Sequence, residues 1–401
     1  MMNMHTGVAI ALAVIAWALV AERLEKWNIT SPMWFVAIGL VVANGSWAPV
    51  HISLGSEGVK EIAELALAVV LFGDAAKVRL RDLRADAALP TRLLGLGLPL
   101  TIALGTVAAH LVLPSLSWWV CAVIGASVAP TDAALGAAII EDERVPARIR
   151  RVLNVESGLN DGIATPFVNF FLVAAVVGTS LETESESTAI LELLKGVAGG
   201  VIIGSLGAFA LTVARRSGWG GHAYRHLAVT ALALASFTIT VSLHGNGFVA
   251  AFVAGLAFGA GMRDAEQLDE SLEFTHQVAG LASMVVWFLF GAVVLPVLEH
   301  ATWREFVFAA LALTVVRMVP VALSLMGTHF DRATVGVIGW FGPRGLASVV
   351  FALLAEEGLA EGDATRVVAA IAATVAMSVV LHGATAAPIS ARYGATHAES
   401  P

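Results

Sequence analysis

The sequence has 401 residues, of which 58% are hydrophobic and 13% are charged, and its formal net charge is −8 at pH 7. Soluble globular domains carry about 25% charged residues, so this composition excludes an ordinary water-soluble protein and indicates that lipid covers much of the chain. The basic residues form no single stripe, which argues against a nucleic-acid partner. A lone cysteine, Cys121, excludes a disulfide framework.

A transmembrane helix needs about 20 predominantly apolar residues, and segments of this kind follow one another along the whole chain. The first of them lacks the positive residues that precede the apolar run of a signal peptide, so we interpret it as a retained helix. We therefore expect an all-α polytopic membrane protein, a single transporter unit over residues 1–401. In chain order, thirteen spans are predicted over residues 7–22, 31–48, 58–76, 92–113, 117–140, 147–178, 188–214, 222–243, 247–262, 275–298, 304–326, 332–356 and 365–385.

Basic residues alternate between the connections of these predicted spans. They follow the odd-numbered spans, as Arg23 and Lys26 do after the first, and are nearly absent from even-numbered connections such as 114–117 and 244–247. Cytoplasmic loops retain lysine and arginine. The pattern predicts an N-terminus outside and a C-terminus in the cytoplasm, and from the short termini we expect a bacterial inner membrane.

The span over 117–140 contains a proline and an acidic residue in its middle. Ionisable residues at membrane depth cost about 2.5–3.5 kcal/mol each on insertion scales and by default indicate function. Pro130 is expected to break the helix, and broken backbone at this depth can line a cavity. Freed carbonyls there, with Thr131 and Asp132, would suit a cation. The alternative is a simple proline kink with a carboxylate at a helix start.

The span over 147–178 carries two neighbouring polar stripes. Helical spacing stacks Glu156 on Asn160 and Ser157 on Asp161. Glycines in the same run remove side-chain bulk, so that another backbone can approach closely. Such a face suits a small desolvated ion held by oxygen atoms. The alternative is hydrogen bonding between helices that only stabilises the bundle.

The span over 332–356 is interrupted by glycines and a proline next to Arg344. An unpaired buried charge is very unfavourable, so Arg344 needs a partner, and Glu156 is the candidate. The alternative is that Arg344 extends to the membrane interface. Asp74 and Arg317 are weaker candidates, which we expect to be accessory residues at most.

The two interrupted spans, the fifth and the twelfth, lie seven spans apart. If the chain consists of two six-span repeats joined by one linking span, these two spans occupy the same position in their repeats. Because the offset of seven spans is odd, the second repeat has the inverted topology in the membrane. Paired interrupted helices in corresponding positions indicate a transporter site near the midplane. We therefore expect two inverted six-helix repeats whose interrupted helices cross.

Three motifs in these spans resemble those of the monovalent cation:proton antiporter family, which includes bacterial NhaP-type antiporters and eukaryotic Na+/H+ exchangers. The motifs are Pro130-Thr131-Asp132, Glu156-Ser157-Gly158-Leu159-Asn160-Asp161-Gly162 and Phe341-Gly342-Pro343-Arg344-Gly345. The resemblance implies a homodimer with two functional parts in each chain. The implied ion-transport core covers approximately 92–178 and 304–385, and the implied dimerisation side covers approximately 7–76 and 188–298.

The resemblance also implies roles for single residues. The counterpart of Asp161 binds the transported monovalent cation, and those of Thr131, Asp132 and Ser157 help to surround it. Asn160, which we place with the ion- and proton-binding residues, is associated with electroneutral one-for-one exchange. The counterparts of Glu156 and Arg344 form a structural ion pair.

One departure from the family concerns the third span. Many members have a Phe-Glu pair near its end, whereas this chain has Phe72-Gly73-Asp74. A shift by one position turns a side chain about 100° around a helix, which puts direct ion contact by Asp74 in doubt.

We expect an antiporter that exchanges Na+, or alternatively Li+ or K+, for H+. Burial disfavours the charged form of a carboxylate, so that proton and cation would compete for Asp161 while alternating access carries the site across. The expected partners are membrane lipid, monovalent cations, protons and a second copy, with no cofactor, nucleotide or nucleic acid. A cation channel and an intramembrane enzyme are the alternatives, but Ser157 has no histidine in its motif, so no catalytic residue is expected.

Overall fold

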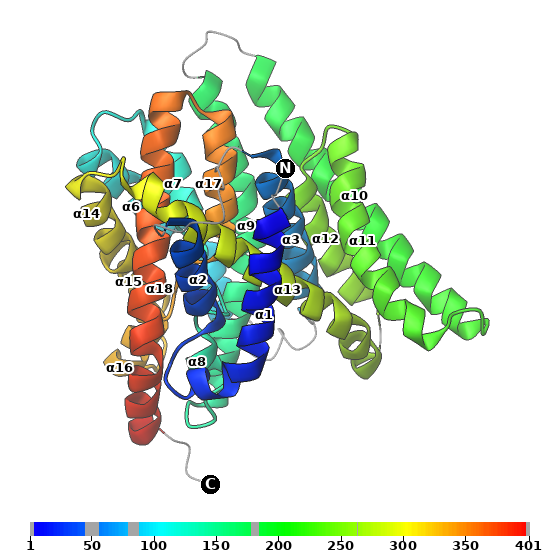
Figure 1. The fold of residues 1–401 in the computed structure, drawn as a ribbon. Coiled ribbons are helices and arrows are strands. Elements are labelled where there is room, and N and C mark those ends of the chain that lie inside the picture. Colours follow the sequence, from blue (N-terminus) through cyan, green and yellow to red (C-terminus); the bar gives the residue numbers. More distant parts are fainter. Residues whose placement is uncertain (1–3, 45–55, 79–87, 178–183, 263, 398–401) are drawn as a thin grey trace. The chain divides into compact units, whose positions relative to one another are not determined.

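The computed structural model describes residues 4–44, 56–78, 88–177, 184–262 and 264–397, and this part of the chain is helical, without a strand (Figure 1). This confirms the predicted all-α class. Clustering of contacts divides the chain into two compact units, each described below by itself. The first comprises Met1–Lys60, Ala88–Asn160 and Met284–Pro401, and the second comprises Glu61–Ala87 and Asp161–Ser283.

The helices follow the predicted apolar ranges closely, and each of the thirteen ranges coincides with one helix or with consecutive shorter ones. They are α1 (Met4–Glu25), α2 (Ser31–Asn44), α3 (Glu57–Lys77), α5 (Ala88–Arg92), a π-helical turn (Leu93–Gly97), α6 (Leu98–Val112), α7 (Trp118–Ser127), α8 (Ala137–Ile140), α9 (Ala147–Val177), α10 (Glu184–Arg216), α11 (His222–Ser242), α12 (Gly247–Gly261), α13 (Ala265–Leu298), α14 (Trp303–Leu313), α15 (Val315–Ser324), α16 (Arg332–Trp340), α17 (Leu346–Gly358) and α18 (Glu361–His397).

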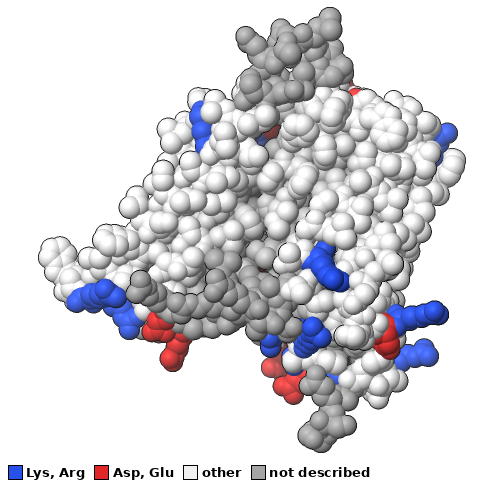
Figure 2. Space-filling model, turned by 180° about the vertical axis from the view of Figure 1, so that it is seen from behind, with Lys and Arg blue, Asp and Glu red and all other residues white. Residues whose placement is uncertain are grey.

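Many of these helices suit a membrane. Within the described residues, eight helical segments are long and apolar enough to cross one, judged by length and composition, and α2, α7 and α12 are shorter apolar helices. Large apolar side chains such as Leu19 and Leu111 are exposed, and the face in Figure 2 is mostly free of charged side chains. Contact with lipid accounts for such a surface, since it would be unfavourable in water. The exact number of spans stays a prediction.

In the first unit, α18 packs against α7, α14 and α17 (Figure 1). Helices α2 and α13 come into very close contact because both lack side-chain bulk where they cross. A Cβ atom added at Gly39 would overlap the carbonyl oxygen of Phe288, and one added at Gly291 would overlap that of Val36. Small residues at such crossings are typical of helix packing in membranes.

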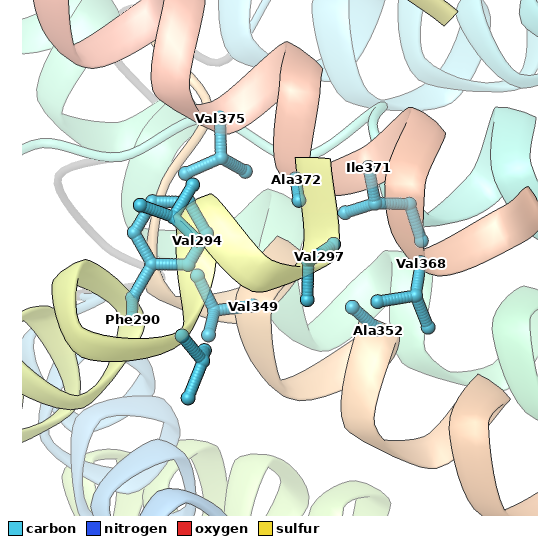
Figure 3. Close-up of a pocket in the computed structure, with 10 residues that line it drawn as sticks. Phe290, Val294, Val297, Val349, Ala352, Val368, Ile371, Ala372 and Val375 are labelled. Atoms are coloured by element: carbon cyan, nitrogen blue, oxygen red, sulfur yellow. The ribbon is translucent and has the colours of Figure 1, made fainter. Parts of the chain in front are cut away.

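A small cavity in the first unit is entirely apolar. It has a volume of about 20 Å³ and lies between α13, α17 and α18 (Figure 3). The side chains of Phe290, Val294, Val349, Ile371 and Val375 are among those that surround it. Because a buried water needs two to four polar partners, this space stays dry and does not suit an ion.

The second unit is built around α10, α11 and α12, which pack side by side (Figure 1). A Cβ atom at Gly200 or Gly204 of α10 would overlap the backbone of α12 at Ala250 or Ala254. Gly255 of α12 approaches the carbonyl oxygen of Phe72 in α3 in the same way. Close backbone packing through glycine therefore holds this unit together.

The start of α13 differs from the prediction, which placed the tenth span at 275–298. The helix begins ten residues earlier, at Ala265, through a polar segment. Asp264 accepts a hydrogen bond from the backbone N–H of Gln267 (3.4 Å), and Glu266 lies in the first turn. Both features stabilise a helix N-terminus, so hydropathy alone misses this extension.

Candidate functional site

Two helices of the first unit are interrupted where proline and glycine predict it. Between α7 and α8, residues 128–136 leave the helical conformation around Pro130, and between α16 and α17, residues 341–345 are not helical. Ser117 caps the start of α7 and Asp331 caps the start of α16 through hydrogen bonds to backbone N–H groups. Each interrupted helix is thus anchored at its start and broken in its middle.

The two interruptions meet at Asp132. Its backbone N–H donates to the carbonyl oxygen of Pro343 (2.8 Å), and its Oδ2 accepts from the N–H of Leu346 (3.1 Å). Its Oδ1 accepts from Ala134 (2.7 Å) and Leu135 (3.4 Å). The carboxylate therefore caps α17, a position that the helix dipole favours. This gives Asp132 a bridging role besides the cation-binding role expected from the sequence.

Gly345 makes this bridge possible. A Cβ atom at this position would overlap the Asp132 carboxylate. We expect Gly345→Ala to lower stability by about 1–3 kcal/mol through overpacking, and by more where the hydrogen bonds of Asp132 are displaced, because each bond to a charged group contributes about 1.5–3 kcal/mol. Thermal unfolding in detergent measures the loss.

The control for this prediction is Gly336→Ala in α16. An added Cβ atom there meets no other atom within 4 Å. Alanine is favoured over glycine inside a helix by up to about 1 kcal/mol, so this variant should be as stable as the parent or slightly more so. Equal unfolding temperatures for the two variants would contradict the importance of the bridge.

Arg344 is fully buried and is held by backbone carbonyl groups from two other interruptions. Its Nη1 donates to Ala129 (2.7 Å) and Pro130 (3.1 Å), and its Nη2 donates to Ala312 (3.2 Å) at the end of α14. Helix α14 is separated from α15 at Thr314, and this break was not predicted. Three interrupted segments therefore converge on one guanidinium group.

The structure corrects the predicted pair of Glu156 with Arg344. Both carboxylate oxygens of Glu156 accept hydrogen bonds from Arg317, one of them over 2.9 Å, and both side chains are buried. Arg317 was expected to be an accessory residue at most. The guanidinium of Arg317 can reach the carboxylate because Gly342 has no side chain, since a Cβ atom there would overlap it. The two Nη groups of Arg344 donate to freed carbonyl groups instead of to a carboxylate.

Three of the predicted site residues form a buried polar cluster in the first unit. The hydroxyls of Thr131 and Ser157 are 3.1 Å apart, and Asn160 Nδ2 donates to Thr131 Oγ1 (2.6 Å). Among the described residues, Asn160 Oδ1 is buried and has no hydrogen-bond partner. A buried acceptor without a partner is unfavourable, so this oxygen suits a ligand. The cluster offers neutral oxygen atoms of the kind that bind hard cations.

Asp161 and Asp74 belong to the second unit. Asp161 directly follows Asn160 in α9 and is partly buried, and its backbone carbonyl accepts a hydrogen bond from Thr165 Oγ1 (2.8 Å). Asp74 lies near the end of α3 and is also partly buried. Their roles in ion binding stay predictions.

Two residues of α18 that were not predicted hold the break between α16 and α17. His382 Nε2 is 3.0 Å from the carbonyl oxygen of Trp340, and its Nδ1 is 3.0 Å from Ser378 Oγ, which accepts from the backbone N–H of Arg344 (2.7 Å). Nδ1 also lies 3.2 Å from the carbonyl oxygen of Ser378, so His382 contacts both the break, at Trp340, and the backbone of its own helix. The spacing of a serine and a histidine four residues apart in an apolar span was the available signal.

Interrupted helices whose breaks meet around buried ionisable residues are typical of secondary transporters. The chain belongs to the sodium/hydrogen exchanger family, whose transmembrane model matches residues 9–392. This confirms the family that the three motifs indicate.

Curated relatives and solved structures agree with this assignment. The chain is 26% identical to the K(+)/H(+) antiporter NhaP of Alkalimonas amylolytica over 298 residues, 73% of this chain and 50% of that protein. It is 26% identical to the Na(+)/H(+) antiporter NhaP of Pseudomonas aeruginosa over 306 residues, 72% of this chain and 71% of that one. The chain spans about half the length of the first of these relatives.

A solved structure shows the same fold over nearly the whole chain. The sodium proton antiporter MjNhaP1 from Methanocaldococcus jannaschii at pH 8 matches with a TM-score of 0.77 and 19% identity. The match covers 98% of this chain and 99% of that one. At this level of identity the likeness establishes the fold.

Proposed function

We propose that this chain is a secondary antiporter that exchanges one Na+ for one H+ across the membrane. The observation that carries the proposal is the buried cluster of Thr131, Ser157 and Asn160, whose Oδ1 oxygen has no partner among the described residues. The cluster lies next to two interrupted helices, and in sequence it is followed by Asp161.

The charges of the first unit support Asp161 as the exchanging carboxylate. Glu156 is paired with Arg317, and Asp132 accepts three backbone hydrogen bonds. A cation bound to Glu156 would leave the buried charge of Arg317 without its partner, and a cation bound to Asp132 would leave backbone N–H groups without their acceptor. In the proposal, Asp161 therefore supplies the negative charge, and Thr131, Ser157 and Asn160 supply neutral oxygens. One carboxylate binds either one cation or one proton, which gives electroneutral exchange.

The proposal also assigns parts of the chain to separate tasks. Residues 92–178 and 304–385 form the transport core, and this is supported by the positions of Glu156, Arg317 and Arg344 within those ranges. Residues 7–76 and 188–298 mediate homodimer formation. The N-terminus lies outside and the C-terminus in the cytoplasm of a bacterial inner membrane, in agreement with the alternation of basic residues.

A second candidate function is K+/H+ exchange. It is favoured by the Alkalimonas amylolytica relative, which is named as a K(+)/H(+) antiporter. Both candidates use the same carboxylate and differ only in the cation that the neutral oxygens select.

Cation-driven proton flux in proteoliposomes tests the proposal. The purified chain is reconstituted with a pH-sensitive dye inside, and Li+, Na+, K+ or choline is added outside. We expect saturable alkalinisation with Na+, none with choline, and no effect of clamping the membrane potential. A lower half-saturating concentration for K+ than for Na+ would select the second candidate, and flux that depends on the membrane potential would contradict one-for-one exchange.

A further inference from the structure

The second unit contains a large cavity, and no residue of the proposed cation site is among those that line it. It has a volume of about 690 Å³ and is formed by the last turns of α10, the end of α12 and the start of α13. Part of its wall is apolar, with Ala208, Phe209, Ala257 and Met262. Its size is in the range of cavities that bind small organic ligands.

The other part of the wall is basic. Arg215 and Arg216 are the last two residues of α10, and both are exposed. Arg215 donates a hydrogen bond to Gln267, and no described acidic side chain forms an ion pair with either arginine. Asp264 is the one acidic residue among those that line the cavity. Two arginines against one aspartate leave an excess of positive charge beside an apolar wall.

The surroundings of the cavity indicate how a ligand would enter. The side chain of Phe209 is 67% exposed and continues a row of exposed apolar residues on α10 that includes Leu206 and Val213. Trp219, three residues beyond the helix, is 90% exposed. Tryptophan is enriched where a membrane helix reaches the interface, so we expect the end of α10 to lie at the boundary between the hydrocarbon and the polar headgroups.

We propose that this cavity binds an anionic phospholipid. The phosphate group accepts hydrogen bonds from Arg215 and Arg216, and an acyl chain lies along Phe209 and the apolar wall. Arginine matches the geometry of phosphate oxygens, and basic pockets between membrane helices bind anionic headgroups. Arginines at the end of α10 also suit the negative end of the helix dipole, but the dipole alone requires no apolar cavity beside them.

The test measures lipid binding by the full chain in detergent. The probe is phosphatidylglycerol, with phosphatidylcholine as the zwitterionic lipid and glycerol 3-phosphate as the soluble headgroup. Binding is followed by native mass spectrometry and by the shift of the unfolding temperature. The variants are Arg215→Gln, Arg216→Gln and the double variant, with Arg151→Gln as a matched control because Arg151 is an exposed arginine in the first unit, outside the cavity.

We expect phosphatidylglycerol to bind and to raise the unfolding temperature of the parent and of Arg151→Gln. Each cavity variant should bind it about five-fold more weakly, and the double variant more weakly still. Equal binding by the double variant and the parent would overturn the proposal. It would also be overturned if phosphatidylcholine bound equally well, or if glycerol 3-phosphate alone gave the full shift, since the ligand would then be no anionic lipid.

Discussion

The Asp161→Asn variant is expected to lose cation-dependent proton flux altogether while it still folds and inserts. Asparagine keeps the size and the hydrogen-bonding capacity of the side chain but neither binds a proton in this pH range nor carries the charge that a cation requires. The measurement is the internal pH of proteoliposomes after a Na+ jump. The unfolding temperature in detergent shows that the variant is folded.

Asp363→Asn is the control for this loss. Asp363 lies in the first turn of α18 and is also partly exposed, but it is no part of the polar cluster. Its variant should exchange ions like the parent. If Asp161→Asn retained saturable exchange, Asp161 would not be the carboxylate for which the two ions compete, and the mechanism would be wrong even if antiport itself persisted.

The Arg317→Met variant is expected to have the largest effect on stability. Glu156 is buried and is hydrogen-bonded through both carboxylate oxygens to Arg317, so methionine would leave its charge without a partner. Removing one member of a buried ion pair typically lowers stability by about 3–5 kcal/mol. Denaturation in detergent measures the change, and loss of transport should accompany it because α9 and α15 are no longer linked.

A double-mutant cycle assigns the pair. Arg317→Met combined with Glu156→Leu should recover much of the loss, since replacing both members of a buried pair with apolar groups is often neutral. Arg344→Met combined with Glu156→Leu should show a smaller coupling energy, because Arg344 donates to carbonyl groups. Stronger coupling of Glu156 to Arg344 than to Arg317 would restore the pairing expected from the sequence.

Hydropathy and proline predicted most of the helical layout. The breaks at Pro130 and Pro343 lie where a missing N–H and neighbouring glycines predict them. The break at Thr314 was missed because no proline or glycine marks it. It depends on contacts that local sequence does not show. The carbonyl of Ala312 accepts a hydrogen bond from Arg344, which lies in another interrupted helix.

The polar cluster was predictable to a similar extent. Helical spacing and the motifs brought Thr131, Ser157 and Asn160 into one candidate site, and the structure places them within hydrogen-bonding distance. The partner of Glu156 was not predictable, since two arginines in apolar spans could each reach it. Which arginine pairs with Glu156 depends on where the freed carbonyl groups lie. Their positions follow from the three-dimensional arrangement of the three helix interruptions.

The carbonyl cage around Arg344 has a consequence for ion selection. Selective filters in channels strip an ion of water by surrounding it with backbone oxygens. Here the carbonyl oxygens of Ala129, Pro130 and Ala312 already accept hydrogen bonds from the guanidinium of Arg344, which is a permanent part of the chain. We therefore expect a transported ion to be coordinated by side chains instead. Preference among Na+, Li+ and K+ should then change with single substitutions at Thr131 or Ser157, without rebuilding the backbone.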